Sequence, residues 1–207
     1  MGGLARDNDG VLTPDVLPRS IETRRLILRP PTAGDVAAIS RLINHREIAL
    51  NLSAVRYPYP PISAWGWLAS AQRVGNGAFH RPYLLHLRAN PRLFAGVIGL
   101  TARADSPPEI GYWLGRPYWR KGYASEAARA LISAIFSKSD VAAVGAKAHI
   151  RNIASQRVLK ASGMRRVGRA RDKSVQLGRY VPVLVYRIER DAWLQSNGAG
   201  AQLQGPL

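Results

Sequence analysis

The stretch from Glu109 to Ala127 constrains the fold more than any other part of the sequence. Residues 109–114 predict a short strand, and residues 122–137 carry small and apolar side chains at helical spacing. A short basic loop, Trp-Arg-Lys-Gly at 119–122, joins the two. A strand that turns within a few residues into a helix leaves several N–H groups at the helix start without carbonyl partners. The stretch therefore predicts an anion-binding junction in an α/β fold.

The side chains of this loop suit a diphosphate. Gly122 lets a ligand approach the backbone without a Cβ in the way, and Ala124 is small for the same reason. Ser125 adds a hydroxyl donor, and Arg120 and Lys121 add positive charge. The loop has neither the spacing of a Walker loop nor the three glycines of a dinucleotide fingerprint. An ordinary tight strand-to-helix turn is the alternative interpretation of these residues alone.

Composition excludes several kinds of chemistry. The 207 residues include no cysteine, which excludes disulfides, thiolate metal sites and a cysteine nucleophile. The four histidines show no metal-binding spacing, so no metal is expected. Thirty Lys and Arg residues against 13 Asp and Glu residues give a net charge of +17. Such an excess favours nucleotide phosphates, nucleic acid, ribosomes or acidic proteins as partners, although it serves solubility equally well.

The chain is expected to form one domain over residues 21–194. Residues 1–20 and 195–207 are rich in glycine and polar residues without periodicity, and are predicted to be flexible tails. No secretory signal is visible at the start, and no apolar run is long enough to span a membrane. These observations predict a soluble cytoplasmic protein.

The remaining patterns predict a mixed sheet. A helix between two strands near the centre implies a right-handed crossover and parallel pairing, whereas a turn at 89–92 implies an antiparallel hairpin. A capping-box-like start at 32–35 opens one helix, and Ser63 is expected to cap another. The expected strands are 21–29, 79–88, 93–103, 109–114, 141–150, 165–171 and 181–190, and later helices cover 122–137 and 152–162.

Three blocks in order resemble one known family. The loop Trp119-Arg-Lys-Gly-Tyr-Ala124 is similar to the cofactor loop of the GNAT acetyltransferase superfamily, and within it of the RimJ/RimL-like group. Residues 152–164, an Asn-x-x-Ser helix ending in Gly-Met, and residues 22–30 resemble two further family blocks. Trp119 stands where the family has Gln or Arg, and Arg120 where it commonly has Gly. The resemblance covers about residues 20–192.

The resemblance implies a twisted, mostly antiparallel sheet with a central splayed parallel strand pair and about four flanking helices. It also implies acetyl-coenzyme A as acetyl donor, with direct transfer to an amine and no metal. The cofactor residues carried over are Trp113, Leu114, Arg120, Lys121, Gly122, Tyr123, Ala124, Ser125 and Asn152. Asn152 would bind the pantetheine arm, although a plain helix N-cap is the alternative.

The resemblance further implies two catalytic candidates and an acceptor region. Ser155 would protonate the departing thiolate, and Glu109 would act as base, with a strand-edge charge or a salt bridge with an arginine as the alternative. Tyr57, Tyr59 and Trp65 are expected near the acceptor, although packing explains most such aromatics. The acceptor is a protein N-terminus, including ribosomal ones, an amino acid or a small amine, and a homodimer is expected from the family. A nucleic-acid- or ribosome-binding module and a non-catalytic acyl-coenzyme A sensor remain rival hypotheses.

Overall fold

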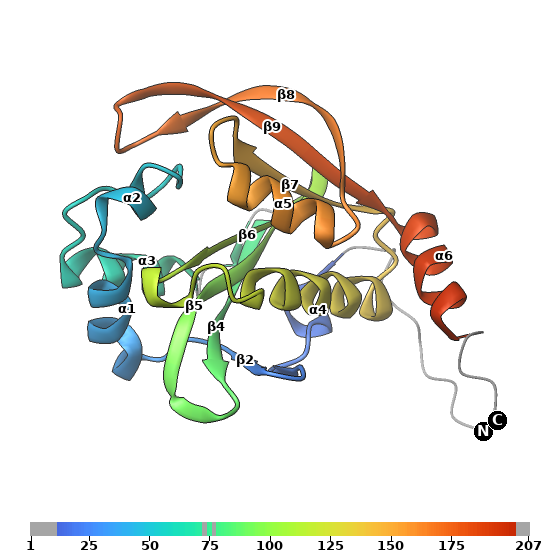
Figure 1. Ribbon diagram of the computed structural model, residues 1–207, viewed down its shortest axis with the longest axis horizontal. Coiled ribbons are helices and arrows are strands. Elements are labelled where there is room, and N and C mark those ends of the chain that lie inside the picture. The colour runs from blue at the N-terminus through green and yellow to red at the C-terminus, as the bar shows by residue number, and fades with distance from the viewer. Residues whose placement is uncertain (1–11, 72–73, 76–77, 202–207) are drawn as a thin grey trace.

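The computed structural model describes residues 12–71, 74–75 and 78–201, which form one mixed sheet with helices on both faces (Figure 1). Its strands are β1 (Ile21–Glu22), β2 (Leu26–Arg29), β3 (Val74–Gly75), β4 (Ala78–Leu87), β5 (Asn90–Arg103), β6 (Ser106–Leu114), β7 (Ala143–His149), β8 (Arg165–Ser174) and β9 (Arg179–Glu189). The helices are α1 (Val36–Ile43), α2 (Arg46–Ala49), α3 (Pro61–Ala71), α4 (Tyr123–Lys138), α5 (Ile153–Ala161) and α6 (Arg190–Ala201).

The strand order is β1-β2-β4-β5-β6-β7-β9-β8, with β3 beside β4. The pair β6–β7 is parallel, and the other pairs of the described residues are antiparallel. β6 and β7 pair at one register position, Glu109 with Gly145, while β6 stays on β5 as far as Leu114 and β7 stays on β9 as far as His149. The two central strands therefore separate toward their C-terminal ends, and the predicted splayed pair is confirmed.

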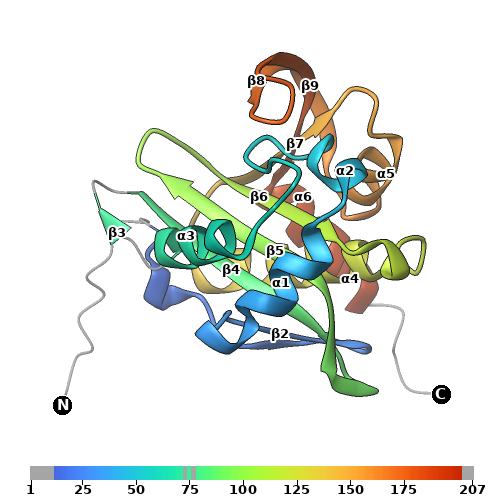
Figure 2. The same ribbon diagram turned by 90° about the vertical axis from the view of Figure 1, so that its left-hand side faces the viewer.

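Two hydrophobic cores lie on opposite faces of the sheet. The α4 core includes Ile98, Ile110, Leu131 and Tyr186, and the α1–α3 core includes Ile39, Leu68, Leu84 and Val97. Neighbouring residues of one strand point to opposite cores, as Val97 and Ile98 do, because strand side chains alternate between faces. Figure 2 shows α1 and α3 in front of the sheet and α4 behind it. The sheet is thus buried on both faces at β4 and β5, beside the strands that separate.

Two predicted elements near the N-terminus differ in the structure. The expected strand 21–29 is a tight hairpin, because Thr23 N–H donates to Leu26 O (2.9 Å) and Leu26 N–H donates to Thr23 Oγ1 (2.9 Å). The helix expected to be capped by Ser63 begins instead at Pro61, whose fixed φ suits a first helical position. The capping box at Thr32–Asp35 is confirmed, and it opens a short 3₁₀ turn ahead of α1.

The segments expected to be tails are partly ordered. Leu12 and Leu17 are buried in the α4 core, and Tyr83 Oη donates to Pro18 O (2.7 Å), so residues 12–20 pack against the sheet. Residues 1–11 lie outside the described part of the chain. At the other end, α6 continues to Ala201, and its Trp193 ring lies 5.3 Å from the ring of Phe136. The rest of the expected C-terminal tail, residues 202–207, is also outside the described part.

Candidate active site

The loop between β6 and α4 has an uncommon backbone. Arg120 has φ +59° and Gly122, the N-cap of α4, has φ +78°, so two of three consecutive residues are left-handed. Glu126 N–H makes the first bond back to the helix start, to Gly122 O at 3.1 Å. The N–H groups of the preceding turn have no helical acceptor, and glycine has no side chain to cap them. The loop therefore presents backbone donors at the positive end of a 16-residue helix.

The side chains of the loop place positive charge at its surface. Arg120 and Lys121 are exposed, and the ring of Tyr118 lies 5.9 Å from Lys121 Nζ. Trp119 is 40% exposed, and its indole Nε1 donates to Leu114 O at 2.7 Å. This bond ties the end of β6 to the loop, and gives a structural reason for an aromatic residue at position 119. Ala124 is buried, and Ser125 is half-buried in the first turn of α4.

Asn152 and Ser155 stand at the start of α5. Asn152 Oδ1 accepts from Ser155 N–H at 3.0 Å, so Asn152 is the N-cap that was the alternative interpretation. The amide Nδ2 of Asn152 makes no hydrogen bond to the part of the chain that the structure describes. Ser155 Oγ lies 2.9 Å from Tyr112 Oη, and Tyr112 Oη also donates to Ser155 O at 3.1 Å. The hydroxyl pair bridges β6 to α5 across the gap between the separating strands.

Tyr112 was not predicted from the sequence. It is an ordinary strand residue in the pattern, and only its reach to α5 in three dimensions singles it out. Burial raises the pKa of the Tyr112 phenol well above its ordinary value, and this outweighs the opposite effect of the hydrogen bond with Ser155. The phenol is therefore neutral at physiological pH and acts as a hydrogen-bond donor.

Glu109 does not join this pair. Ile110 belongs to the α4 core and Tyr112 contacts α5, so Glu109 and Trp113 project from the other face of β6. The Glu109 carboxylate is paired with Lys147 Nζ at 2.9 Å, which is the salt-bridge alternative with lysine as the partner. Trp113 packs against the α1–α3 core, whereas Leu114 packs against the α4 core. The structure thus separates the two catalytic candidates onto opposite faces.

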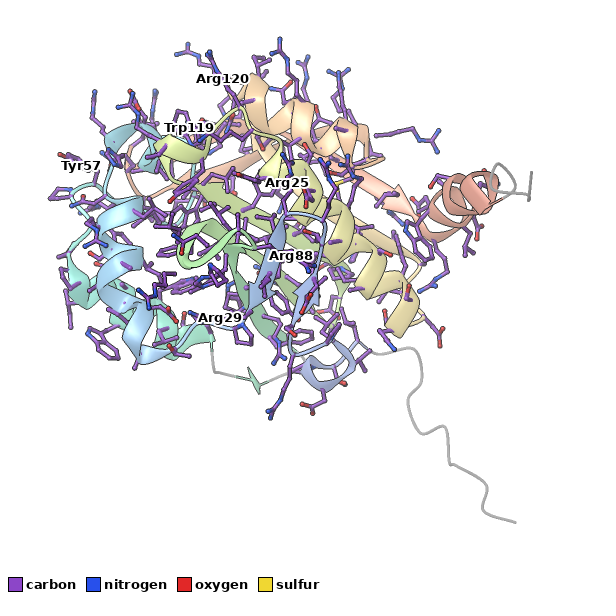
Figure 3. The ribbon with its side chains drawn as sticks, turned by 60° about the horizontal axis from the view of Figure 1, so that its bottom comes forward. Arg25, Arg29, Tyr57, Arg88, Trp119 and Arg120 are labelled. Carbon is purple, nitrogen blue, oxygen red and sulfur yellow. The ribbon has the colours of Figure 1, made fainter. Side chains whose placement is uncertain are left out.

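The aromatic residues expected near the acceptor have different surroundings. Tyr59 is buried in the α1–α3 core, its backbone bonded to Asn44 and Ser40, so packing explains it. Tyr57 is 42% exposed and Trp65 is 47% exposed. Figure 3 shows Tyr57 at the same end of the molecule as Trp119. Of the three candidates, Tyr57 and Trp65 have exposed side chains.

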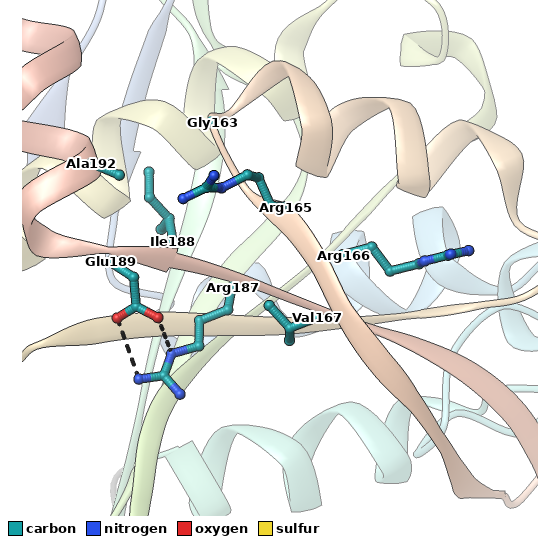
Figure 4. Close-up of a pocket in the computed structure, with 8 residues that line it drawn as sticks. All are labelled: Gly163, Arg165, Arg166, Val167, Arg187, Ile188, Glu189 and Ala192. Atoms are coloured by element: carbon teal, nitrogen blue, oxygen red, sulfur yellow. Dashed lines mark hydrogen bonds and ion pairs between the residues drawn. The ribbon is translucent and has the colours of Figure 1, made fainter.

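A pocket of about 290 Å³ lies away from this loop, where β8, β9 and α6 meet (Figure 4). Arg165 and Arg166 point to different sides of β8, and Arg187 is paired with Glu189 at 2.8 Å. None of the predicted site residues lines the pocket, so it is not the candidate active site. In the described residues no cluster of His, Asp and Glu is arranged to hold a metal ion, and no helix is both long and apolar enough to cross a membrane.

Comparisons with known proteins agree with this geometry. The sequence pattern of the acetyltransferase (GNAT) domain matches residues 25–165. The uncharacterized N-acetyltransferase YoaA of Bacillus subtilis is 29% identical over 175 residues, which cover 81% of this chain and 95% of YoaA.

Solved structures share the fold. A RimL ribosomal L7/L12 α-N-protein acetyltransferase in complex with coenzyme A has a TM-score of 0.70 at 23% identity, covering 84% of this chain and 99% of its own. A spermidine N-acetyltransferase from Vibrio cholerae, in complex with coenzyme A and spermine, has a TM-score of 0.67 at 18% identity, covering 83% and 99%. With the family pattern matching most of the chain around the splayed strands and the α4 loop, this protein belongs to the GNAT acetyltransferase domain family and is an acyltransferase.

Proposed function

We propose that the protein uses acetyl-coenzyme A to acetylate a primary amine directly. The observation that carries this proposal is the left-handed loop at Arg120–Gly122, which opens the N-terminus of α4 beside the gap between β6 and β7. Gly122 suits this loop because its φ of +78° favours glycine and because a Cβ there would crowd Arg25 Nη2 at 3.2 Å, and it is exposed to solvent at the helix start. The residues present therefore fit the phosphate-bearing part of the coenzyme.

Each part of the site has a role in this proposal. The first-turn N–H groups of α4, with Ser125, Arg120 and Lys121, bind the diphosphate. The edge of β6 that has separated from β7 and the free amide of Asn152 bind the pantetheine arm. The coenzyme supplies an activated thioester. The protein supplies orientation, which alone lowers the barrier by holding both reactants in place.

Ser155 and Tyr112 handle the proton of the leaving group. Ser155 would donate its hydroxyl proton to the leaving sulfur and take up the proton that the attacking amine loses, so that its own hydroxyl is restored. The neutral phenol of Tyr112, which donates to Ser155 O in the structure, would turn its one proton toward Ser155 Oγ as negative charge develops there. Glu109 forms a salt bridge with Lys147 on the other face of β6, so this scheme assigns it no role as a base. A peptide α-amine has a pKa of about 8, against about 10.4 for lysine, and is partly neutral without a base.

The acceptor we propose is the α-amine of a protein or peptide, in keeping with a RimJ/RimL-like protein. The coenzyme A-bound RimL structure, named as an α-N-protein acetyltransferase, supports this choice, while the spermidine enzyme makes a polyamine the second candidate. A cytoplasmic location, where acetyl-coenzyme A and new N-termini meet, belongs to the same proposal. The homodimer expected from the family stays a prediction that light scattering will test.

Calorimetry with acetyl-coenzyme A tests the donor. Gly122→Glu should weaken binding by about tenfold or more, because it adds bulk and a negative charge in the loop. Gly178→Glu is the matched control, since Gly178 is also left-handed, at φ +64°, but lies in the β8–β9 turn with open space around it. Equal affinity in the wild type and a folded Gly122→Glu variant would remove the loop from the site.

A thiol-release assay on three acceptors tests the transfer. The first acceptor is a peptide whose free amine is the N-terminal α-amine. The second is a peptide with a blocked N-terminus, whose free amine is a lysine side chain, and the third is spermidine. Turnover of the first peptide alone supports the proposed acceptor, and turnover of spermidine alone supports the second candidate. Binding of acetyl-coenzyme A without any turnover would favour the non-catalytic sensor. Failure to bind acetyl-coenzyme A, together with salt-sensitive binding of RNA, would favour the nucleic-acid module.

A further inference from the structure

The side chain of Arg25, in the turn between β1 and β2, contacts the α4 loop, which lies about a hundred residues later in the sequence. Its Nη1 donates to Lys121 O at 2.9 Å, and its Nε donates to Glu126 Oε2 at 2.6 Å. Its guanidinium carbon lies 4.8 Å from the centre of the Tyr123 ring. One planar group thus contacts the loop before, at and after the helix start, which a fork of fixed N–H donors can do and an ammonium group cannot.

Glu126 is the fixed point of this arrangement. Its side chain is 13% exposed, and its carboxylate accepts from Thr23 Oγ1 (2.7 Å), from Arg25 N–H (2.8 Å) and from Arg25 Nε. Burial on its own would raise the pKa of Glu126, but these hydrogen bonds outweigh it and hold the pKa below its ordinary value. The carboxylate is therefore charged throughout the neutral range.

A charged carboxylate in the first turn of α4 creates a problem for an anionic ligand at the same helix end. It stabilises the helix, but it would repel a diphosphate bound to the neighbouring N–H groups. Arg25 pairs with this carboxylate, and its Nη2 lies 3.2 Å from where a Cβ of Gly122 would be, at the loop itself. Arg25 therefore cancels the unfavourable charge and also fixes the position of the loop backbone.

We propose that Arg25 is a positioning residue of the coenzyme site, holding the left-handed loop through Lys121 O and neutralising Glu126. This inference rests on the proposed use of acetyl-coenzyme A. Arg88 provides a matched comparison, because it lies in the β4–β5 turn beside Arg25, and its N–H donates to Arg25 O at 2.9 Å. Its side chain pairs with Glu22 at 3.2 Å and donates to Thr23 O at 3.1 Å. In the view of Figure 3, Arg25 lies between Arg120 and Arg88. None of the hydrogen bonds that Arg88 makes within the described residues reaches the α4 loop.

Calorimetry with coenzyme A, on variants shown by circular dichroism to be folded, tests the proposal. Arg25→Ala should weaken the affinity for coenzyme A by about tenfold, because it removes the hydrogen bond to Lys121 O and leaves the Glu126 carboxylate to repel the diphosphate. Arg25→Lys keeps the charge but not the two-pronged contact, and should also weaken affinity by about fivefold. Arg88→Ala removes one positive charge nearby and should stay within about twofold of the wild type.

A double-mutant cycle separates positioning from general loss of charge. Glu126→Gln in the Arg25→Ala background should recover about half of the lost affinity on a logarithmic scale, because it removes the unpaired carboxylate. With saturating acetyl-coenzyme A, kcat of Arg25→Ala should remain within about twofold of the wild type, as expected for a residue that acts on donor binding.

Three outcomes would overturn the proposal. The first is an affinity for coenzyme A in Arg25→Ala that equals the wild-type value. The second is an equal loss of that affinity in Arg25→Ala and Arg88→Ala. The third is strict additivity of the binding free energies of the Arg25 and Glu126 variants. Absence of coenzyme A binding in the wild-type protein would instead refute the proposed function, so the two failures are distinguishable.

Discussion

At the residue scale, the conformation of Arg120 sets this loop apart. A side chain at φ +59° brings its Cβ close to the carbonyl oxygen, at a cost of about 1–2 kcal/mol. The arginine is exposed, and its side chain makes no hydrogen bond to the described residues that would offset this cost. The turn into α4 therefore imposes the left-handed backbone, and Arg120 adopts it at a conformational cost.

Replacing Arg120 with glycine tests this strain. Arg120→Gly should raise the free energy of unfolding by about 0.5 kcal/mol, because relief of strain exceeds the entropy that glycine adds to the unfolded chain. Lys121→Gly, whose backbone is not left-handed, should instead lower it by about 0.5–1 kcal/mol. Urea denaturation of both variants measures the difference. Destabilisation by both changes would show that Arg120 is not strained.

Tyr112 and Ser155 lead to a second prediction at this scale. Tyr112→Phe should lower kcat more than it changes the affinity for acetyl-coenzyme A, because the phenol supports Ser155 and not the diphosphate. It should also lower the free energy of unfolding by about 1 kcal/mol, since a part-buried hydroxyl loses its partner. Because the pKa of Tyr112 is raised, the shape of the rate profile between about pH 6 and 9 should not change. An unchanged kcat would exclude the pair from proton transfer.

At the element scale, the junction of β2 and α1 depends on Asp35. Its carboxylate accepts from Arg29 at 2.7 and 2.9 Å and from Thr32 N–H and Oγ1 at 2.7 Å. Burial on its own would raise the pKa of Asp35, but these bonds prevail and lower it to about 2. Because the folded pKa lies below the unfolded value, the contribution is present at neutral pH and is lost as pH falls from about 4 to about 2.

Asp35→Asn removes this contribution. We expect the free energy of unfolding at pH 7 to fall by about 1–2 kcal/mol, with the difference from wild type shrinking as pH drops toward 2. Asp105→Asn, in the exposed β5–β6 turn, is the control and should follow the wild-type curve. Chemical denaturation from about pH 2 to 7 measures all three proteins. A constant difference at every pH would contradict the assignment to Asp35 ionisation.

Elements with strong local patterns were predictable from the sequence. The stripe along α4 and the hairpin of β4 and β5 depend on periodicity and turn residues. The limits of α4 and β4 lie within one residue of the predicted ones, and β5 begins three residues earlier than predicted. The four-residue helix α2 was missed because one turn has no periodicity to detect. The helix α6 was missed as a whole, because Gly198 and Gly200 in its second half lower helix propensity.

The candidate site was predictable from the sequence only where it consists of contiguous motifs. The α4 loop and the start of α5 are such motifs, and both lie beside the separating strands. The contacts of Arg25 with Glu126 and of Tyr112 with Ser155 join residues 101 and 43 positions apart. Such pairs are set by the order of strands in the sheet. The face on which Glu109 projects likewise depended on the register of β6, which a single sequence does not specify.

At the scale of the whole molecule, the positive charge is spread widely and includes one sheet edge. β8 is the last strand of the sheet, and it exposes Arg165, Arg166, Arg169, Arg171 and Lys173. Charged side chains on an edge strand prevent pairing with another sheet, so protection of this edge explains them without a nucleic-acid partner. The charge would also raise the local concentration of the proposed anionic coenzyme.

The tip of the β8–β9 hairpin contacts residues 53–57, the segment that follows α2. Ser53 Oγ donates to Asp172 Oδ2 (2.6 Å), Val175 N–H donates to Ser53 O (2.9 Å), and Tyr57 N–H donates to Gln176 Oε1 (2.6 Å). Figure 1 shows this tip beside the segment that follows α2. The contacts hold the region of Tyr57, an exposed candidate for contact with the acceptor, against the C-terminal half of the sheet.

Loosening this connection should affect the acceptor and not the donor. Asp172→Asn with Ser53→Ala should raise KM for the acceptor by about threefold to tenfold, because the Tyr57 region loses its support, while coenzyme A affinity stays within about twofold. The Val175 and Tyr57 amides should exchange with solvent faster, because both lie at the contact. Arg171→Ala, exposed on the same strand, is the control. A loss of coenzyme A affinity with an unchanged KM for the acceptor would contradict this prediction. It would show that the hairpin supports the donor site and not the acceptor region.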